Sequence, residues 1–352
     1  MSGVTGRQLK IAFTKFGANS WGVAASVTRG VYFESDGGVK FDPNIVVDDA
    51  FGQLFEGTTE VGDIKAPKPT WTQQARYDDH SFILQGCAMG SPTAVTIATS
   101  AAGQVTSWQH ILDLADVIDG LGVTMAIDKV LYTEELTSAK FHGFTVKNGT
   151  GGVMTMAFKV TGSKPTIQSS ININSTLAVA SYPALGNRVF RKHGTFRMNL
   201  NTAGALGASD AVKIEDWQFD FDRPQDNPQV FGQDFIDEPA DDKFPMFSLS
   251  VSYPRMNTVA ANSLYASLRD ATALKADMTF LGAFINSTDQ YKRLYQFPYL
   301  QLESWEGPTS GGNQIKPKAK FKALLAATSP TGMAFVRPFR LTCIQTNSLI
   351  AF

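Results

Sequence analysis

The sequence is poor in cysteine and in net charge. Among its 352 residues only two are cysteines, and its formal net charge is −1. Cys87 and Cys343 cannot build a disulfide framework, and neither belongs to a CxxC pair. We therefore expect two buried thiols in a protein made in a reducing cytoplasm. The near-neutral net charge also argues against a nucleic-acid-binding protein that holds phosphates with a basic face.

Long apolar runs are missing as well. No run reaches the roughly 18–20 residues of a membrane-spanning helix, and the first residues, MSGVTGRQLKIAF, lack the apolar core of a signal peptide. We therefore expect a soluble, unsecreted protein without a membrane partner.

Signatures of catalysis are absent from the sequence too. It contains no GxSxG elbow, no P-loop and no HExxH motif, and its four histidines are isolated from one another. Asp220 and Asp222 form a DxD, but they lie on an alternating segment where Phe219 and Phe221 point inward. A solvated strand face explains this pair better than a metal site. We expect no enzyme, no cofactor and no bound metal.

Phenylalanine, by contrast, is abundant at 25 residues, and most segments alternate apolar with polar residues. A period of two is typical of half-buried strands, so a mainly β fold is predicted. Residues 141–152, FHGFTVKNGTGG, run into the alternating segment 154–160 and predict a β-hairpin. Helices are few: residues 78–90 have an Asp start signal and a Gly stop, and residues 256–273 form the matching segment.

One phrase occurs twice, as FGQLF at residues 51–55 and FGQDF at residues 231–235. The same shift of 180 residues aligns further identities, such as Phe41-Asp42 with Phe221-Asp222. We infer an internal duplication. The predicted division is a first domain at residues 1–175, a linker at 176–189 and a second domain at 190–352, with residues 91–107 as an extra piece of the first.

Each copy of the phrase sits in a long acidic connection, at residues 43–65 and 223–243. Connections of this length are usually functional or disordered, and their phenylalanines favour burial over disorder. They either fold back on their own domain or bury against a partner subunit. The residues predicted to make contacts between subunits or rings are Phe51, Gly52, Gln53, Phe55, Phe231, Gly232, Gln233 and Phe235.

A row of lysines alternates with apolar residues near the end of the chain. On a strand, the side chains of Lys316, Lys318, Lys320 and Lys322 share one face. This row is either a solvated face or protected edge, or a surface that meets the acidic connections of a neighbouring copy.

These patterns resemble the major tail tube protein of long-tailed, non-contractile phages. The resemblance lies in GVYFESDGGVKFDPNIVVDDAFGQLFEG, RYDDHSFILQGCAMGS, KFHGFTVKNGTGGVMTMAFKVTG and FDFDRPQDNPQVFGQDFIDEP. It implies two duplicated β-sandwich or half-barrel domains, each with one flanking helix and a long extended arm loop. Chains with two such domains form trimeric, pseudo-hexameric rings that stack into a tube in the virion tail.

The resemblance further implies a channel through which genome DNA passes without sequence-specific binding. The other implied partners are a tape measure protein and a tail terminator. The lumen face is expected to be the polar face of the long hairpin, with Thr155, Lys159 and Thr161, or else the face that carries the lysine row.

Three alternatives stay open. The chain could be an inner tube or baseplate component of a contractile tail or secretion machine. It could be a glycosidase that uses Asp220 and Asp222, although that chemistry needs two carboxylates set apart across a cleft. It could also be a binding module with an exposed aromatic patch.

Overall fold

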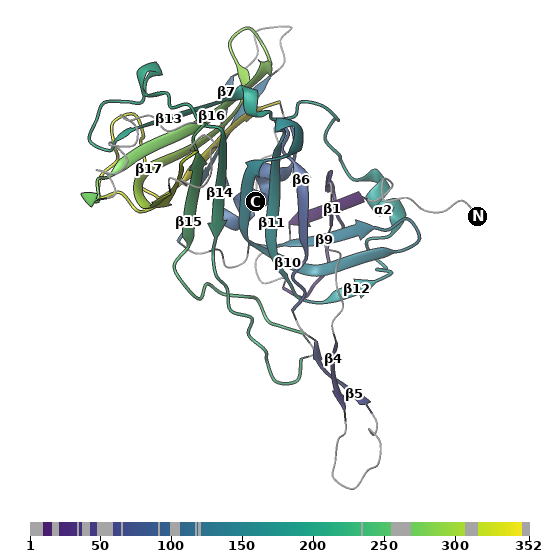
Figure 1. Cartoon of the computed structure of the whole chain (residues 1–352). Helices are drawn as coiled ribbons and strands as arrows, with labels where there is room; N and C mark the ends of the chain where they lie inside the picture. The colour runs from purple at the N-terminus through teal and green to yellow at the C-terminus, as the bar shows by residue number, and fades with distance from the viewer. Residues whose placement is uncertain are drawn as a thin grey trace.

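The structure is a computed structural model, and the expectation of a mainly β fold is confirmed. It describes residues 10–15, 21–33, 35–36, 43–47, 59–64, 66–90, 92–98, 106–116, 118, 121–233, 235–254, 269–306 and 316–346. Figure 1 shows long antiparallel strands that build a broad body, with two narrow projections at one end.

The order in which strands pair is the same in the two halves of the chain. The first half runs β1 (Lys10–Lys15), β9 (Val123–Asp128), β10 (Thr133–Asn148), β11 (Met154–Gly162), β6 (Thr70–Gln74) and β3 (Ser35–Asp36). The second half runs β13 (Gly194–Leu200), β16 (Leu274–Phe284), β17 (Gln290–Glu306), β18 (Lys318–Ala323), β15 (Met246–Ser252) and β14 (Asp216–Asp222). All these pairs are antiparallel, so each position in one half has a counterpart in the other.

Shorter strands complete the two halves. β12 (Pro165–Ile167) pairs with the beginning of β10, and β19 (Arg340–Gln345) pairs with the beginning of β17. The β7–β8 hairpin lies in the first half alone, where the sequence predicts an extra piece. The remaining strands and the hairpin strands are β2 (Arg29–Val31), β4 (Pro43–Val47), β5 (Thr59–Ile64), β7 (Pro92–Ala98) and β8 (Ser107–Asp113).

Two strand pairings join the halves into one hydrogen-bonded structure. β10 pairs with β14, from Gly143 opposite Asp222 to Lys147 opposite Gln218, and β8 pairs with β19. Gly143 permits the close approach of β10 to β14, because a Cβ atom there would lie 2.5 Å from the carbonyl oxygen of Phe221. The β10–β14 seam therefore requires glycine at this position.

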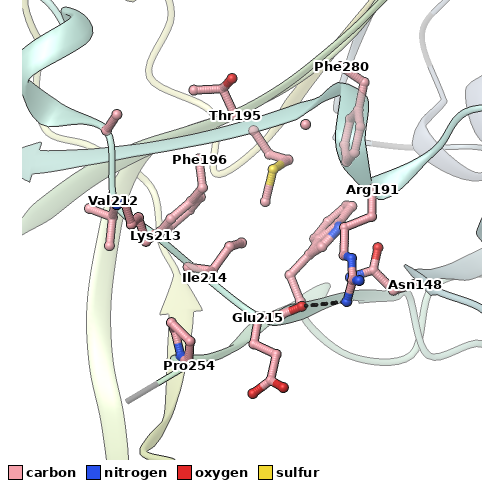
Figure 2. A pocket seen from close by; sticks show the side chains of 14 residues that line it. Asn148, Arg191, Thr195, Phe196, Val212, Lys213, Ile214, Glu215, Pro254 and Phe280 are labelled. Atoms are coloured by element: carbon pink, nitrogen blue, oxygen red, sulfur yellow. Dashed lines mark hydrogen bonds between the residues drawn. The ribbon is translucent and has the colours of Figure 1, made fainter. Parts of the chain in front are cut away.

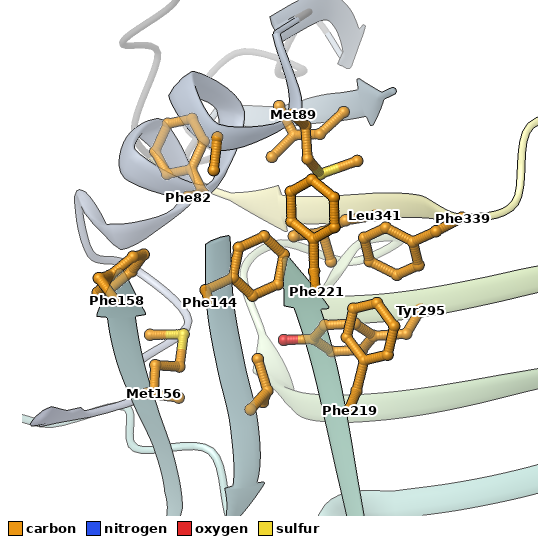
Figure 3. Packing of buried hydrophobic residues seen from close by; sticks show 14 of the residues in the cluster. Phe82, Met89, Phe144, Met156, Phe158, Phe219, Phe221, Tyr295, Phe339 and Leu341 are labelled. Carbon is orange, nitrogen blue, oxygen red and sulfur yellow. The ribbon is translucent and has the colours of Figure 1, made fainter. Parts of the chain in front are cut away.

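The hydrophobic core also crosses this seam. Phe144 of β10 lies against Phe158 of the first half and against Phe219, Phe221 and Phe339 of the second, with ring centroids 5.4–6.4 Å apart. Figure 3 shows these rings together beneath helix α1 (Ser81–Met89). Aromatic pairs of this kind contribute about 0.5–1.5 kcal/mol each beyond their burial. The halves thus share one core.

The predicted domain boundaries are not tested by these contacts and stay a prediction. Within the predicted linker, however, helix α2 (Asn174–Val179) buries Leu177, and Val189 belongs to the shared core. Residues 176–189 are therefore packed against the rest of the protein and do not form an extended linker between the halves.

Helix α1 lies where the sequence predicts it and ends at Gly90, whose φ of 84° is left-handed. The matching segment, residues 256–273, falls mostly outside the described residues. No helix in the described part of the chain is long and apolar enough to cross a membrane.

A buried ion pair links α1 to the second half. Arg293 of β17 is fully buried, and its Nη2 donates to Oδ1 of Asp79 at 2.7 Å, just before the helix. The same nitrogen donates to the carbonyl of Arg76 at 2.5 Å and to the hydroxyl of Ser81 at 3.1 Å. The two hydrogens of this nitrogen are shared among three acceptors, which fix the start of α1 against the second half.

His80 lies beside this pair and is also buried. Its Nδ1 is 3.0 Å from the carbonyl oxygen of Gly30. Burial lowers the pKa of His80; the contact with Gly30 and the carboxylates of Asp79 and Asp78 oppose this shift, and Arg29 adds to it. The neutral imidazole is therefore the form that the fold favours.

Candidate assembly surface

A continuous sheet with one polar and one apolar face crosses the seam between the halves. In register, its strands are β3, β6, β11 and β10 from the first half, followed by β14, β15, β18 and β17 from the second. Paired residues of antiparallel strands point to the same side. One side is the core, and the other is here called the polar sheet face. It carries Thr72, Gln74, Thr155, Lys159, Thr145, Lys147, Gln218, Asp220, Asp222, Ser248, Ser250, Ser252, Lys318, Lys320 and Lys322.

The sequence analysis proposed two alternatives for the lumen face, the polar face of the long hairpin and the face that carries the lysine row. The strand register places β11 of the hairpin and β18 of the lysine row in the same sheet, with their polar residues on the same side. Lys318, Lys320 and Lys322 are exposed, as their alternation predicts. Lys320 pairs with Glu303 at 2.7 Å, and Lys316 pairs with Glu215 at 2.5 Å. Lys318 and Lys322 have no ion-pair partner among the described residues.

The hairpin candidates differ in exposure. Lys159 is half-buried and bridges the seam to Asp222 at 2.7 Å. Thr155 and Thr161 are buried, because Thr155 lies under the Gly149 turn and Thr161 pairs with the covered residue Lys140. These two threonines therefore contribute little to the accessible surface of a single chain.

Asp222 shows that the DxD is part of this polar face. Burial opposes its ionisation, but the imidazole of His142 at 3.5 Å and the ammonium of Lys159 at 2.7 Å outweigh burial and lower its pKa. Asp220 accepts hydrogen bonds from Thr145 and Gln218. No group of three or more metal-binding side chains occurs among the described residues.

The loop between β14 and β15, residues 223–245, contains the second acidic connection and is here called the second arm. Two fully buried cations hold its returning part: Lys140 of β10 and Arg223 at the start of the arm itself. The ammonium of Lys140 donates to Glu238 at 3.0 Å and to the carbonyl of Pro239 at 2.5 Å. The guanidinium of Arg223 lies 3.5 Å from Asp241. This part of the arm folds back on its own chain, which was one of the two expectations.

The FGQ phrase of the second arm forms a tight turn. The amide of Gln233 donates to the carbonyl of Val230 at 3.2 Å, and Gly232 takes a φ of 82° that other residues rarely adopt. Phe231 is fully exposed (106%), whereas Phe235 is half-buried and packs against Gly22. One phenylalanine therefore anchors the arm and the other is presented at its tip.

The first acidic connection forms the β4–β5 hairpin, whose tip, with Phe51, Gly52, Gln53 and Phe55, lies outside the described residues. Figure 1 shows this hairpin and the second arm extending from the same end of the body. The sequence predicted two corresponding arms, and their shared direction comes from the matching positions of β3 and β14.

A pocket of about 540 Å³ lies at the opposite end of β14 and β15. Its walls include the apolar side chains of Phe196, Trp217 and Phe280, and the exposed side chains of Arg191 and Lys213 form its rim. Figure 2 shows Phe196, Phe280, Arg191 and Lys213 among the lining residues. The indole nitrogen of Trp217 is buried and has no hydrogen-bond partner among the described residues. Sequence reasoning missed this pocket, because its lining comes from strands and loops far apart in the sequence.

Sequence reasoning also missed Lys140 and Arg223 as the residues that hold the arm. Both thiols, in contrast, are buried, as expected. Lys140 gives a faint signal in the sequence, since it is the one charged residue in the stretch 136–141, which reads LTSAKF.

Comparisons with known proteins give little. No family model matches the chain, and no curated protein matches it. Among solved structures, the tube-terminating cap of the anti-feeding prophage is similar at 11% identity, over 48% of this chain and 93% of that chain, with a TM-score of 0.27. A likeness at that TM-score carries no argument about fold or function.

Proposed function

We propose that this chain is a tail-related structural protein of a phage, which polymerises as stacked rings into the tail tube through which genome DNA passes. The polar sheet face lines the channel in this proposal. Three copies per ring would place six similar repeats around the axis. The protein would be made in the host cytoplasm and would act in the virion, without catalysis.

The main support for this proposal is the pairing of β10 with β14. Within the described residues the two-faced sheet ends at β3 on one side and at residues 301–306 of β17 on the other. β3 is the counterpart of β14, and β17 is the counterpart of β10. The free edges of β3 and of residues 301–306 of β17 therefore correspond to β14 and β10, the two strands that already pair with each other inside the chain.

Repetition of the same seam between copies would close the sheet into a ring. Closure removes exposed edges, which otherwise invite uncontrolled pairing. With four strands from each repeat, three copies would supply a barrel wider than the 16 to 18 strands that already leave an aqueous channel.

The charges of the polar sheet face suit a channel for DNA. Lysines on β10, β11 and β18 are interspersed with carboxylates on β14, and Lys159 with Asp222 forms an ion pair across the seam. A face of mixed sign lacks the excess of cations that would hold phosphates tightly.

Electron microscopy of the purified protein tests the proposal. We expect rings or tubes, with threefold symmetry in ring averages, at concentrations where the chain assembles. A strictly monodisperse monomer at high concentration would count against it. As a matched test of the seam, Gly143→Val should abolish the β10–β14 pairing and assembly together, whereas Gly204→Val, in open space on a loop, should assemble normally.

A further inference from the structure

The second arm and the pocket lie at opposite ends of the same two strands. β14 leads directly from Glu215 and Trp217 in the pocket wall to Arg223 at the start of the arm, and β15 returns from the arm to Pro254 beside the pocket. A seven-residue strand spans roughly 23 Å. Copies stacked along this direction would bring the arm of one copy to the pocket of the next.

The second arm has apolar residues at its tip, and the rest of the arm is acidic. Phe231 is fully exposed and Val230 is 41% exposed, in a turn fixed by Gly232. Between Pro224 and Asp242 the sequence holds six carboxylates and no lysine or arginine. Two of these carboxylates, Glu238 and Asp241, face the buried cations Lys140 and Arg223, while Asp237 is exposed.

The pocket offers the complementary chemistry. Its walls are aromatic, and a cavity of about 150 Å³ already accepts benzene, so about 540 Å³ leaves room for the ring of Phe231. Of the charged side chains at its rim, Glu215 is already paired with Lys316. Arg191 gives one hydrogen bond to a backbone carbonyl, and Lys213 has no ion-pair partner among the described residues.

We propose that Phe231 of one copy docks in this pocket of the next copy along the tube, with the acidic arm facing Arg191 and Lys213. This inference rests on the proposed function, because it needs copies that stack. The contact joins two different surfaces, and such a head-to-tail contact does not close on itself but extends into a filament. In this proposal the contact between arm and pocket stacks one ring on the next, and pairing of the free strand edges closes each ring.

Cysteine cross-linking tests the proposal directly. Tubes of a Val230→Cys, Val212→Cys double variant, which keeps the ring of Phe231, should give a ladder of disulfide-linked chains under mild oxidation, because Val230 lies next to Phe231 at the arm tip and Val212 lies in the pocket wall. Each single variant should give none, since Cys87 and Cys343 are buried. Tubes without a ladder would overturn the docking proposal and leave the tube function standing.

Assembly thresholds give a second readout. Phe231→Ser should raise the concentration needed for tube growth by about 10- to 100-fold, as expected for loss of one buried aromatic contact. Phe244→Ser is the matched control, because Phe244 is 92% exposed on the same arm but away from its tip. An unchanged threshold for Phe231→Ser would refute docking.

Charge reversal adds a test of the rim. Lys213→Glu should weaken stacking, and Asp237→Lys in the same chain should restore it. Absence of restoration would overturn the charge assignment.

Two further outcomes separate the proposals. A wild-type chain that never assembles would overturn both the tube function and the docking. An intramolecular cross-link from Val212→Cys to a cysteine placed in residues 255–268 would assign the pocket to the chain itself and would overturn the docking alone.

Discussion

Replacing Asp79 by asparagine should strongly destabilise the protein. Arg293 is fully buried and its partner carboxylate is almost so, with the two joined at 2.7 Å. Asparagine keeps the shape and one acceptor oxygen, but it leaves the guanidinium without a counter-charge. Breaking a buried pair in this way costs about 3–5 kcal/mol. Because Arg293 belongs to the second half and Asp79 to the first, the loss should loosen α1 from the second half.

Chemical denaturation measured by far-ultraviolet circular dichroism gives the change in unfolding free energy. The double variant Asp79→Asn, Arg293→Met removes the stranded charge, so it should be more stable than Asp79→Asn alone. Asp116→Asn is the control, because it breaks an exposed pair with Arg337 and should leave the midpoint unchanged. A loss below about 1 kcal/mol for Asp79→Asn, or additive losses in the double variant, would refute the reasoning.

Three further predictions follow from buried and exposed charges. Because burial lowers the pKa of His80, its contribution to stability is present above its unfolded value of about 6.5 and is lost as pH falls through the folded pKa. His80→Gln should therefore flatten the decline in unfolding midpoint between pH 6.5 and 5, and an unchanged slope would contradict this. Glu238→Gln should destabilise the chain by about 1.5–3 kcal/mol in denaturation experiments, because Lys140 stays buried without its carboxylate; equal midpoints would show that the arm is not held there. Joint replacement of Lys318 and Lys322 by glutamate should leave tube formation intact in electron micrographs but lower infectivity of particles that carry it, and a failure to form tubes would place these lysines in a contact instead.

The alternation of apolar and polar residues made much of the fold predictable. The hairpin around residue 150 and the helix that ends at Gly90 both follow from local patterns. These patterns work because each strand buries one face and exposes the other. The inward orientation of Phe219 and Phe221 follows for the same reason.

The candidate site was less predictable. The sequence identified the FGQ phrase as a pair of arm centres, but it treated Phe231 and Phe235 alike. In the structure the tight turn at Gly232 separates them, so that one ring is exposed and the other packs on Gly22. Thr155 and Thr161 lie on the expected face but are covered, because a turn and a paired neighbour reach over them.

The sequence by itself determined the β class, the duplication of the FGQ phrase and the faces of individual strands, because all three depend on residues close together along the chain or on literal repetition. Only the tertiary structure decided how the two halves join. The β10–β14 seam depends on the close approach at Gly143, the shared core depends on Phe144 meeting rings from both halves, and the arm depends on the buried ammonium of Lys140 from the distant strand β10. Contacts between residues roughly 75 to 100 positions apart leave no local pattern in the sequence.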